Sequence, residues 1–241
     1  MKDTAEIFRK LKDGLIVSCD SEDNGPFSDP AQIALFAKAA IMGGASGIRA
    51  EGTVLLSEII QQCSVPVTGW LKSTFGDGTL GSTATLAEVE SLIASGCDIV
   101  AVDGTFRRRD GITGPQFVER IKREFQCIVM ADVSTFAEGV ACADYGADCV
   151  SSFLSGFTGD TQHMAQDKPD LNIIMTLVRE LTIPIFAHGR VSTPKFAKEL
   201  ILSGAWAVAA GTAITKPKLI SNRFSEAIKH ARDEEYEKVF E

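Results

Sequence analysis

The chain has 241 residues, 45% of them hydrophobic and 23% charged, and 24 Lys and Arg against 32 Asp and Glu give a formal net charge of −8. This composition excludes a disordered or collagen-like chain, and the acidic balance disfavours general binding to nucleic acid or to an anionic membrane. Because no apolar run is long enough to span a bilayer and no secretory leader opens the chain, we expect a soluble, cytoplasmic protein that contacts neither nucleic acid nor membrane.

Eight short apolar runs recur along the chain and predict eight β-strands. They occupy residues 14–19, 47–50, 66–71, 98–102, 127–131, 148–151, 184–187 and 206–210. Their starts lie about 27 residues apart, which is the length of one strand, one helix and two loops. The runs lack a strict polar and apolar alternation, which is typical of parallel strands covered by helices.

Helix signals fill the intervals between these runs. Asp29 with Pro30, Thr83, and Ser134 with Glu138 stand where helices would begin. Four intervals end in a helix-terminating glycine directly before a strand, at Gly44-Ala45, Gly96-Cys97, Gly146-Ala147 and Gly204-Ala205. This repeat predicts one (β/α)8 barrel domain over residues 1–241. An open doubly wound sheet is the alternative, but no Gly-rich dinucleotide fingerprint follows the first strand.

In such a barrel the catalytic groups lie at the C-terminal ends of the strands and in the loops that follow. The polar or reactive residues at these positions are Cys19, Asp20, Arg49, Glu51, Lys72, Asp103, Asp132, Ser152, His188, Arg190, Gly211 and Thr212. Any one of them could be an ordinary loop residue. Their concentration on one rim predicts an active site there.

Lys72 and His188 are the candidates for proton transfer. Lys72 closes the third strand, where barrel walls would partly desolvate its amine and lower its pKa; the alternative is an ion pair with a carboxylate such as Asp132. His188 ends the seventh strand and has the near-neutral pKa of a proton shuttle; the alternative is a core histidine satisfied by the backbone.

The loops after the seventh and eighth strands predict a phosphate site. Barrels often bind phosphate between these loops, using backbone N–H groups and the start of a short helix. Gly189, Gly211 and Thr212 fit such a cradle, and Arg190 and Lys216 could add charged contacts. Two ordinary tight turns are the alternative interpretation.

Three further features carry weaker expectations. The run 107–110 (RRRD) could reach the active-site mouth, although a surface loop is favoured. Residues 153–168 form a long, Gly-rich sixth loop that could act as a lid. The six cysteines contain no CxxC pair and the three histidines do not cluster, so we expect no metal site.

Several segments taken together resemble the N-acetylmannosamine-6-phosphate 2-epimerases of bacterial sialic-acid catabolism. The resemblance runs from about residue 10 to residue 228. Its carrying segments are GLIVSC, GIRAEG at 47–52, Lys72, DIVAVDGT at 98–105, MADVST with EG at 130–139, LSGFT at 154–158, HGR, GAWAV and GTAIT. It implies a phosphate-binding (β/α)8 barrel that inverts C2 of N-acetylmannosamine 6-phosphate without metal or organic cofactor, and a homodimer.

The resemblance also implies roles for individual residues. Lys72 matches the acid/base lysine of the family, and Arg49 and Asp132 match residues that hold the sugar. Three positions depart from the family pattern: Asp20 replaces a neutral glutamine, His188 replaces a carboxylate, and Lys216 replaces an arginine. The third loop, 73–86, also differs. The exact sugar therefore stays open, and a related phosphosugar epimerase or isomerase, or a non-catalytic phosphosugar-binding barrel, remains an alternative.

Overall fold

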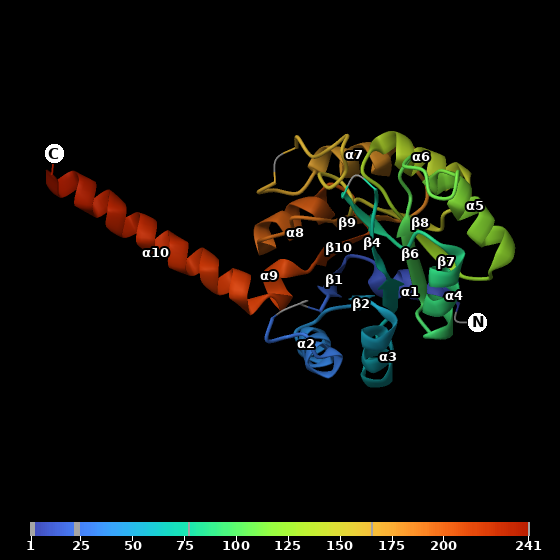
Figure 1. Ribbon diagram of the computed structural model, residues 1–241, viewed down its shortest axis with the longest axis horizontal. Coiled ribbons are helices and arrows are strands. Elements are labelled where there is room, and N and C mark those ends of the chain that lie inside the picture. The colour runs from blue at the N-terminus through green and yellow to red at the C-terminus, as the bar shows by residue number, and fades with distance from the viewer. Residues whose placement is uncertain (1–2, 22–24, 77, 165, 241) are drawn as a thin grey trace.

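The eight predicted strands hydrogen-bond to one another as a closed, parallel barrel (Figure 1). The computed structural model of the protein describes residues 3–21, 25–76, 78–164 and 166–240, with side chains as far as residue 231. The barrel strands are β1 (Gly14–Cys19), β2 (Gly47–Glu51), β3 (Val67–Trp70), β6 (Ile99–Asp103), β7 (Ile128–Asp132), β8 (Cys149–Ser151), β9 (Ile185–His188) and β10 (Ala207–Ala210). β1 pairs with both β2 and β10, which closes the sheet. The predicted (β/α)8 barrel is confirmed.

Helices alternate with the barrel strands and mostly cover their outer face (Figure 1). They are α1 (Thr4–Leu11), α2 (Pro30–Met42), α3 (Thr53–Gln62), α4 (Leu86–Ala94), α5 (Gly114–Glu124), α6 (Phe136–Asp144), α7 (Leu171–Glu180), α8 (Pro194–Leu202), α9 (Thr212–Thr215) and α10 (Pro217–Phe240). Reciprocal capping boxes start α4 at Thr85 and α6 at Thr135, one or two residues later than the sequence signals suggested.

The core has two layers. The larger one lies between the barrel and its helices and contains residues such as Ile33, Ile59 and Val118. The smaller one fills the barrel, where Trp70, Met130 and Phe186 pack inward. Ile7 and Leu11 of α1 belong to this inner layer, so α1 closes the bottom of the barrel. The open end is therefore the one with the C-terminal strand ends.

The third unit contains a hairpin that the sequence analysis did not predict. The third strand ends at Trp70, and β4 (Lys72–Thr74) then pairs antiparallel with β5 (Leu80–Ser82) in a separate two-stranded sheet. Lys72 therefore does not close a barrel strand as expected. It stands at the start of a hairpin on the barrel rim.

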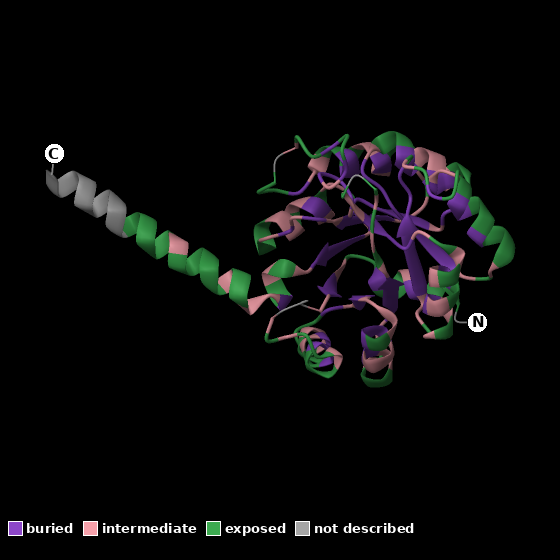
Figure 2. Ribbon diagram, in the orientation of Figure 1, coloured by how far each residue is buried: buried purple, intermediate pink, exposed green. Residues whose placement is uncertain are grey.

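The last helix departs from the barrel pattern. α10 projects away from the barrel, and its described part is mostly exposed (Figures 1 and 2). Within the described part of the chain, no helix is both long and apolar enough to cross a membrane. All six cysteines are free thiols.

Candidate active site

A buried ion pair occupies the centre of the C-terminal rim. Arg49 of β2 donates to both carboxylate oxygens of Asp132 at the end of β7, over 3.0 and 2.7 Å. Both side chains are almost completely buried. The hydroxyl of Ser82 donates to the same carboxylate over 2.7 Å. The partner of Asp132 is thus Arg49, and the alternative pairing of Asp132 with Lys72 is not found.

Two aromatic rings, whose centres lie 5.1 Å apart, pack beside the guanidinium of Arg49. The ring centre of Trp70 lies 5.0 Å from the guanidinium carbon and that of Phe153 lies 4.5 Å from it. Phe153 also stacks on the His188 ring, with centroids 4.6 Å apart. The sequence analysis placed Phe153 only in a long loop. No local sequence pattern indicates that its ring packs beside Arg49 and His188.

Three buried polar atoms around these rings lack a hydrogen-bond partner among the described residues. They are Arg49 Nε, Trp70 Nε1 and His188 Nδ1. Buried polar groups are nearly always satisfied, so a cluster of such atoms indicates a place where a polar ligand completes the bonding. The alternative of a core histidine required the backbone to hydrogen-bond the His188 ring. Nδ1 has no such partner among the described residues.

Burial also shifts the protonation of two site residues. The pKa of His188 lies well below its ordinary value because the ring is desolvated and faces the Arg49 cation. Burial raises the pKa of Asp20, against the opposing charges of Arg49 and Lys216. A raised pKa favours the protonated carboxyl, which can donate a hydrogen bond.

A cavity of about 140 Å³ opens between the loops after β9 and β10. Its lining includes the predicted Gly189, Arg190, Gly211 and Thr212 together with Asp20 and His188. Gly189 has a φ of +98°, in the left-handed region that favours glycine. Arg223 of α10 also lines this cavity, and nothing in the sequence pattern suggested it.

The two predicted phosphate-binding cations already have partners. The Lys216 ammonium donates to the backbone carbonyl of Asp20 over 2.6 Å. Arg190 donates from Nε to the Lys168 carbonyl over 2.8 Å and from a terminal nitrogen to the Ser155 carbonyl. Both carbonyls belong to the sixth loop, so Arg190 joins that loop to the rim.

Lys72 lies at the edge of this site. It is paired in register with Ser82, whose hydroxyl contacts Asp132, and its backbone N–H lies 3.4 Å from a Glu51 carboxylate oxygen. Its side chain is exposed. The desolvation expected from a place inside the barrel wall is therefore not found.

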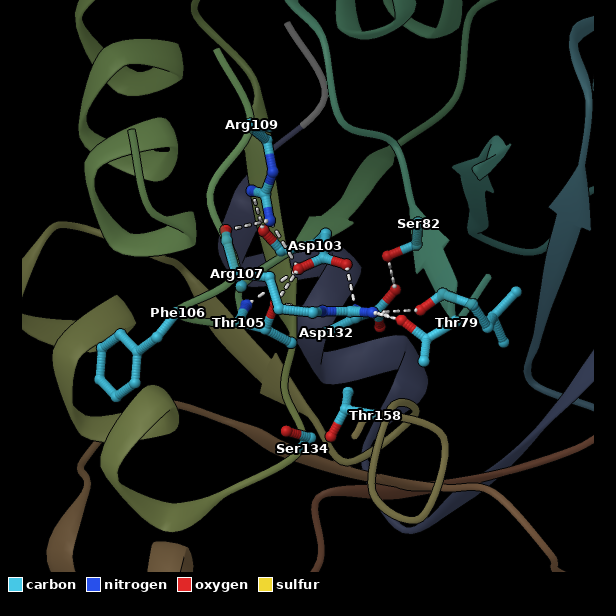
Figure 3. A network of polar contacts seen from close by, with 12 residues as sticks. Thr79, Ser82, Asp103, Thr105, Phe106, Arg107, Arg109, Asp132, Ser134 and Thr158 are labelled. Atoms are coloured by element: carbon cyan, nitrogen blue, oxygen red, sulfur yellow. Dashed lines mark hydrogen bonds and ion pairs between the residues drawn. The ribbon is translucent and has the colours of Figure 1, made fainter. Parts of the chain in front are cut away.

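The surface-loop interpretation of residues 107–110 is wrong for two of the arginines. Arg107 and Arg109 each form an ion pair of 2.7 Å with Asp103, whose side chain is fully buried at the end of β6 (Figure 3). Arg108 alone is exposed. The sequence pattern did not reveal that a buried carboxylate four residues upstream would bring the chain back onto the rim.

Comparison with known proteins shows which family this chain resembles. The family model described as "Putative N-acetylmannosamine-6-phosphate epimerase" (NanE) matches residues 33–230. A protein named "Putative N-acetylmannosamine-6-phosphate 2-epimerase" from Caldanaerobacter subterraneus subsp. tengcongensis is 40% identical over 229 residues, covering 94% of this chain and 96% of the relative. One of the same name from Clostridioides difficile is 38% identical, covering 91% and 97%.

A solved structure shows the same similarity in three dimensions. The N-acetylmannosamine-6-phosphate 2-epimerase from Clostridium perfringens superposes with a TM-score of 0.86 at 31% identity, covering 94% of this chain and 98% of that one. The family match over most of the barrel and this agreement of folds lead to one conclusion: the chain belongs to the NanE family of N-acetylmannosamine-6-phosphate epimerases.

Proposed function

We propose that this protein is an isomerase that interconverts N-acetylmannosamine 6-phosphate and N-acetylglucosamine 6-phosphate by moving the proton at C2. The observation that carries this proposal is the family match over residues 33–230, which includes Arg49, Lys72, Asp132 and His188. The phosphorylated amino sugar would belong to amino-sugar and sialic-acid catabolism. The free state of all six cysteines supports work in the cytoplasm, where thiols stay reduced.

The reaction needs a base, a group that holds the enolate, and a donor on the opposite face. In the open-chain sugar the C1 aldehyde acidifies the C2–H bond. Lys72, as the free amine, takes the C2 proton, and the electron pair of that bond moves into an enolate. Arg49 and Asp132 hold the sugar, and Arg49 Nε, which has no partner among the described residues, is the N–H that Arg49 has left to offer it. His188 relays a proton to C2 on the other face, giving up its ring N–H while its other ring nitrogen takes up a proton from solvent, so that the ring stays neutral and the centre is inverted.

The phosphate is assigned to the cavity between the loops after β9 and β10. Gly189, Gly211 and Thr212 supply backbone groups at its wall, and Arg190 and Arg223 supply charge there. Lys216 supports the site by bonding the Asp20 carbonyl, which leaves its positive charge beside the cavity. A charged phosphate in this place is stabilised by such donors without any metal ligand set.

The test is proton NMR of the protein with N-acetylmannosamine 6-phosphate in deuterated buffer. We expect conversion to the gluco epimer with deuterium at C2, and a loss of at least about 100-fold in rate for Lys72→Ala. Lys195→Ala, on the exposed part of α8, is the matched control. Thermal stabilisation by the sugar phosphate without exchange would contradict the epimerase assignment and identify a binding protein.

We further propose that residues 1–241 form one barrel domain that works as a homodimer through exchange of α10. Ile220, Phe224 and Ile228 repeat every four residues along one side of the helix, and Phe224 and Ile228 are 69% and 62% exposed. The helices beside the β1–β10 seam expose apolar residues too: Met42 of α2 and Leu202 of α8 are 83% and 75% exposed.

A second copy supplies what each of these surfaces lacks. Every other barrel strand is followed by a helix that packs near it, whereas α10 projects away from the seam that it would cover. The α10 of a second chain, placed across α2 and α8, would restore the eighth helix of each barrel. Sedimentation equilibrium should give the mass of two chains, and a monomer at micromolar concentration would contradict the proposal.

A further inference from the structure

The hairpin that carries Lys72 is too small to hold its own position. β4 and β5 have three residues each and belong to a sheet separate from the barrel. Isolated two-stranded hairpins are marginally stable in water. The place of the Lys72 side chain therefore depends on what fastens this hairpin to the rim.

Backbone and side-chain bonds fasten the base of the hairpin. Leu71 and Thr83 exchange two hydrogen bonds, of 2.7 Å to the Leu71 carbonyl and 3.0 Å to the Thr83 hydroxyl. Thr83 has a φ of +26°, outside the regions that β-branched residues prefer. Ser82 contacts Asp132. These contacts fix where the hairpin starts, but none of them reaches its far end.

Two arginines contact the far end: Arg107 donates hydrogen bonds to it, and the guanidinium carbon of Arg109 lies 5.6 Å from the centre of the Phe75 ring. Arg107 donates from one terminal nitrogen to the Thr79 hydroxyl over 2.7 Å and to the Leu80 carbonyl over 2.8 Å. Its guanidinium carbon lies 3.9 Å from the centre of the Phe75 ring, a contact between a cation and an aromatic face. Figure 3 shows the Arg107 side chain extending between Asp103 and Thr79.

The other end of the same guanidinium is fixed to the barrel. Arg107 donates to a carboxylate oxygen of Asp103 over 2.7 Å and from Nε to the Thr105 hydroxyl over 3.0 Å. Asp103 is in turn held by Arg109 and by Thr105. Four hydrogen bonds use most of the five N–H groups of Arg107, so little of it is left to bind a ligand.

We propose that Arg107 is a positioning residue, which joins the hairpin to β6 through Asp103 and so, together with the contacts at the base of the hairpin, determines where Lys72 stands relative to the Arg49–Asp132 pair. This inference rests on the role proposed above for Lys72. A base must be held close to the proton it removes, and a misplacement of about 1 Å can lower a rate 100-fold. The hairpin contacts of Arg107 are thereby linked to catalysis without any contact with the sugar.

The test compares Arg107→Gln and Arg107→Lys with Arg108→Gln. Arg108 is the neighbouring exposed arginine, so its replacement changes the net charge equally but leaves the hairpin contacts intact. For Arg107→Gln we expect kcat to fall roughly 10- to 100-fold with KM within about threefold, because binding groups stay in place. Arg107→Lys keeps the positive charge beside Asp103 but loses the planar guanidinium, which donates several hydrogen bonds at once. Its kcat should therefore lie between those of Arg107→Gln and the unchanged protein.

Hydrogen exchange measured by mass spectrometry provides a readout that is independent of activity. Amides in residues 71–83 should exchange about 10-fold faster in Arg107→Gln, while the barrel strands keep their protection. Phe75→Leu and Thr79→Val remove the hairpin side of the same contacts and leave Asp103 paired, so they test the inference even if Arg107→Gln folds poorly. Both should show the same exchange pattern and a smaller loss of kcat.

The outcomes separate this inference from the proposed function. Unchanged exchange in residues 71–83 for all these variants would overturn the positioning role. So would faster exchange with a normal kcat, provided that Lys72→Ala is inactive. Full activity of Lys72→Ala would instead overturn the assignment of the base itself, whatever Arg107 does.

Discussion

The guanidinium of Arg49 is committed mainly to Asp132. Its terminal nitrogens bond both carboxylate oxygens of Asp132, and the rings of Trp70 and Phe153 pack beside it. Among the described residues, Nε has no hydrogen-bond partner. At the scale of single residues, Arg49 therefore orients Asp132 and has one N–H to offer a ligand.

The effects of replacing Arg49 and Asp132 on the free energy of unfolding should depend strongly on each other. Arg49→Met leaves a carboxylate buried beside Ser82 alone, and Asp132→Leu leaves an unpaired buried cation, so each should lower the free energy of unfolding by about 3–5 kcal/mol. The double variant should lose clearly less than the sum. Urea denaturation at one protein concentration measures this cycle. Additive losses would show that the pair has no mutual stabilisation.

His188 gives the protein a pH dependence of known sign. Its pKa is depressed in the fold, so below its ordinary value of 6.5 the unfolded chain binds a proton that the native ring does not. Stability is therefore fully present above pH 6.5 and falls as the pH drops toward the folded pKa, by up to about 1.4 kcal/mol per pH unit.

Replacement of His188 by Gln should remove this part of the slope between pH 5 and 6.5. His163→Gln and His230→Gln are matched controls, because both histidines are exposed. With three histidines in the chain, the ring proton signals can be followed individually by NMR. A His188 signal that titrates near pH 6.5 would contradict the buried, neutral ring.

At the scale of elements, the barrel could be predicted and the hairpin could not. Most barrel strands are short, mainly apolar runs, a local signal that can be recognised without tertiary context. The hairpin segments KST and LGS are short and polar, and they form because Arg107, Ser82 and Thr83 bond to the barrel. The rim positions of Arg49, Asp132 and His188 were predictable because these residues lie in barrel strands. The partners of Asp103 and Arg190 were not predictable, because those contacts involve loops.

The sixth loop should depend on Arg190 for its order. Gly156 has a φ of +83°, and a Cβ there would lie 2.0 Å from a terminal nitrogen of Arg190. Both Gly156→Ala and Arg190→Gln should therefore release the loop from the rim. We expect faster chymotryptic cleavage at Phe157 and a raised KM. Gly159→Ala is the control, because open space surrounds it, and equal cleavage in all three variants would contradict this role of Arg190.

At the scale of the whole molecule, α10 would link assembly to the active site in the proposed dimer. Its first turns place Arg223 at the cavity between the loops after β9 and β10, and the apolar residues that follow are exposed. A helix that both lines the cavity of its own barrel and packs on a partner would connect the two sites, since any shift of α10 displaces Arg223. No local sequence signal distinguishes this helix from one that folds back on its own barrel, because the same apolar face serves both.

Charges placed on that face should separate the chains. Phe224→Asp with Ile228→Asp introduces two carboxylates where an apolar helix face would be buried, and unpaired charges are costly to desolvate. We expect a monomer by sedimentation equilibrium, a lower melting temperature that no longer rises with protein concentration, and a higher KM for the sugar phosphate. The exposed Ser221→Asp is the control, since it adds charge near the start of the helix away from the apolar spacing. A dimer that survives both substitutions at Phe224 and Ile228 would show that α10 does not form the interface.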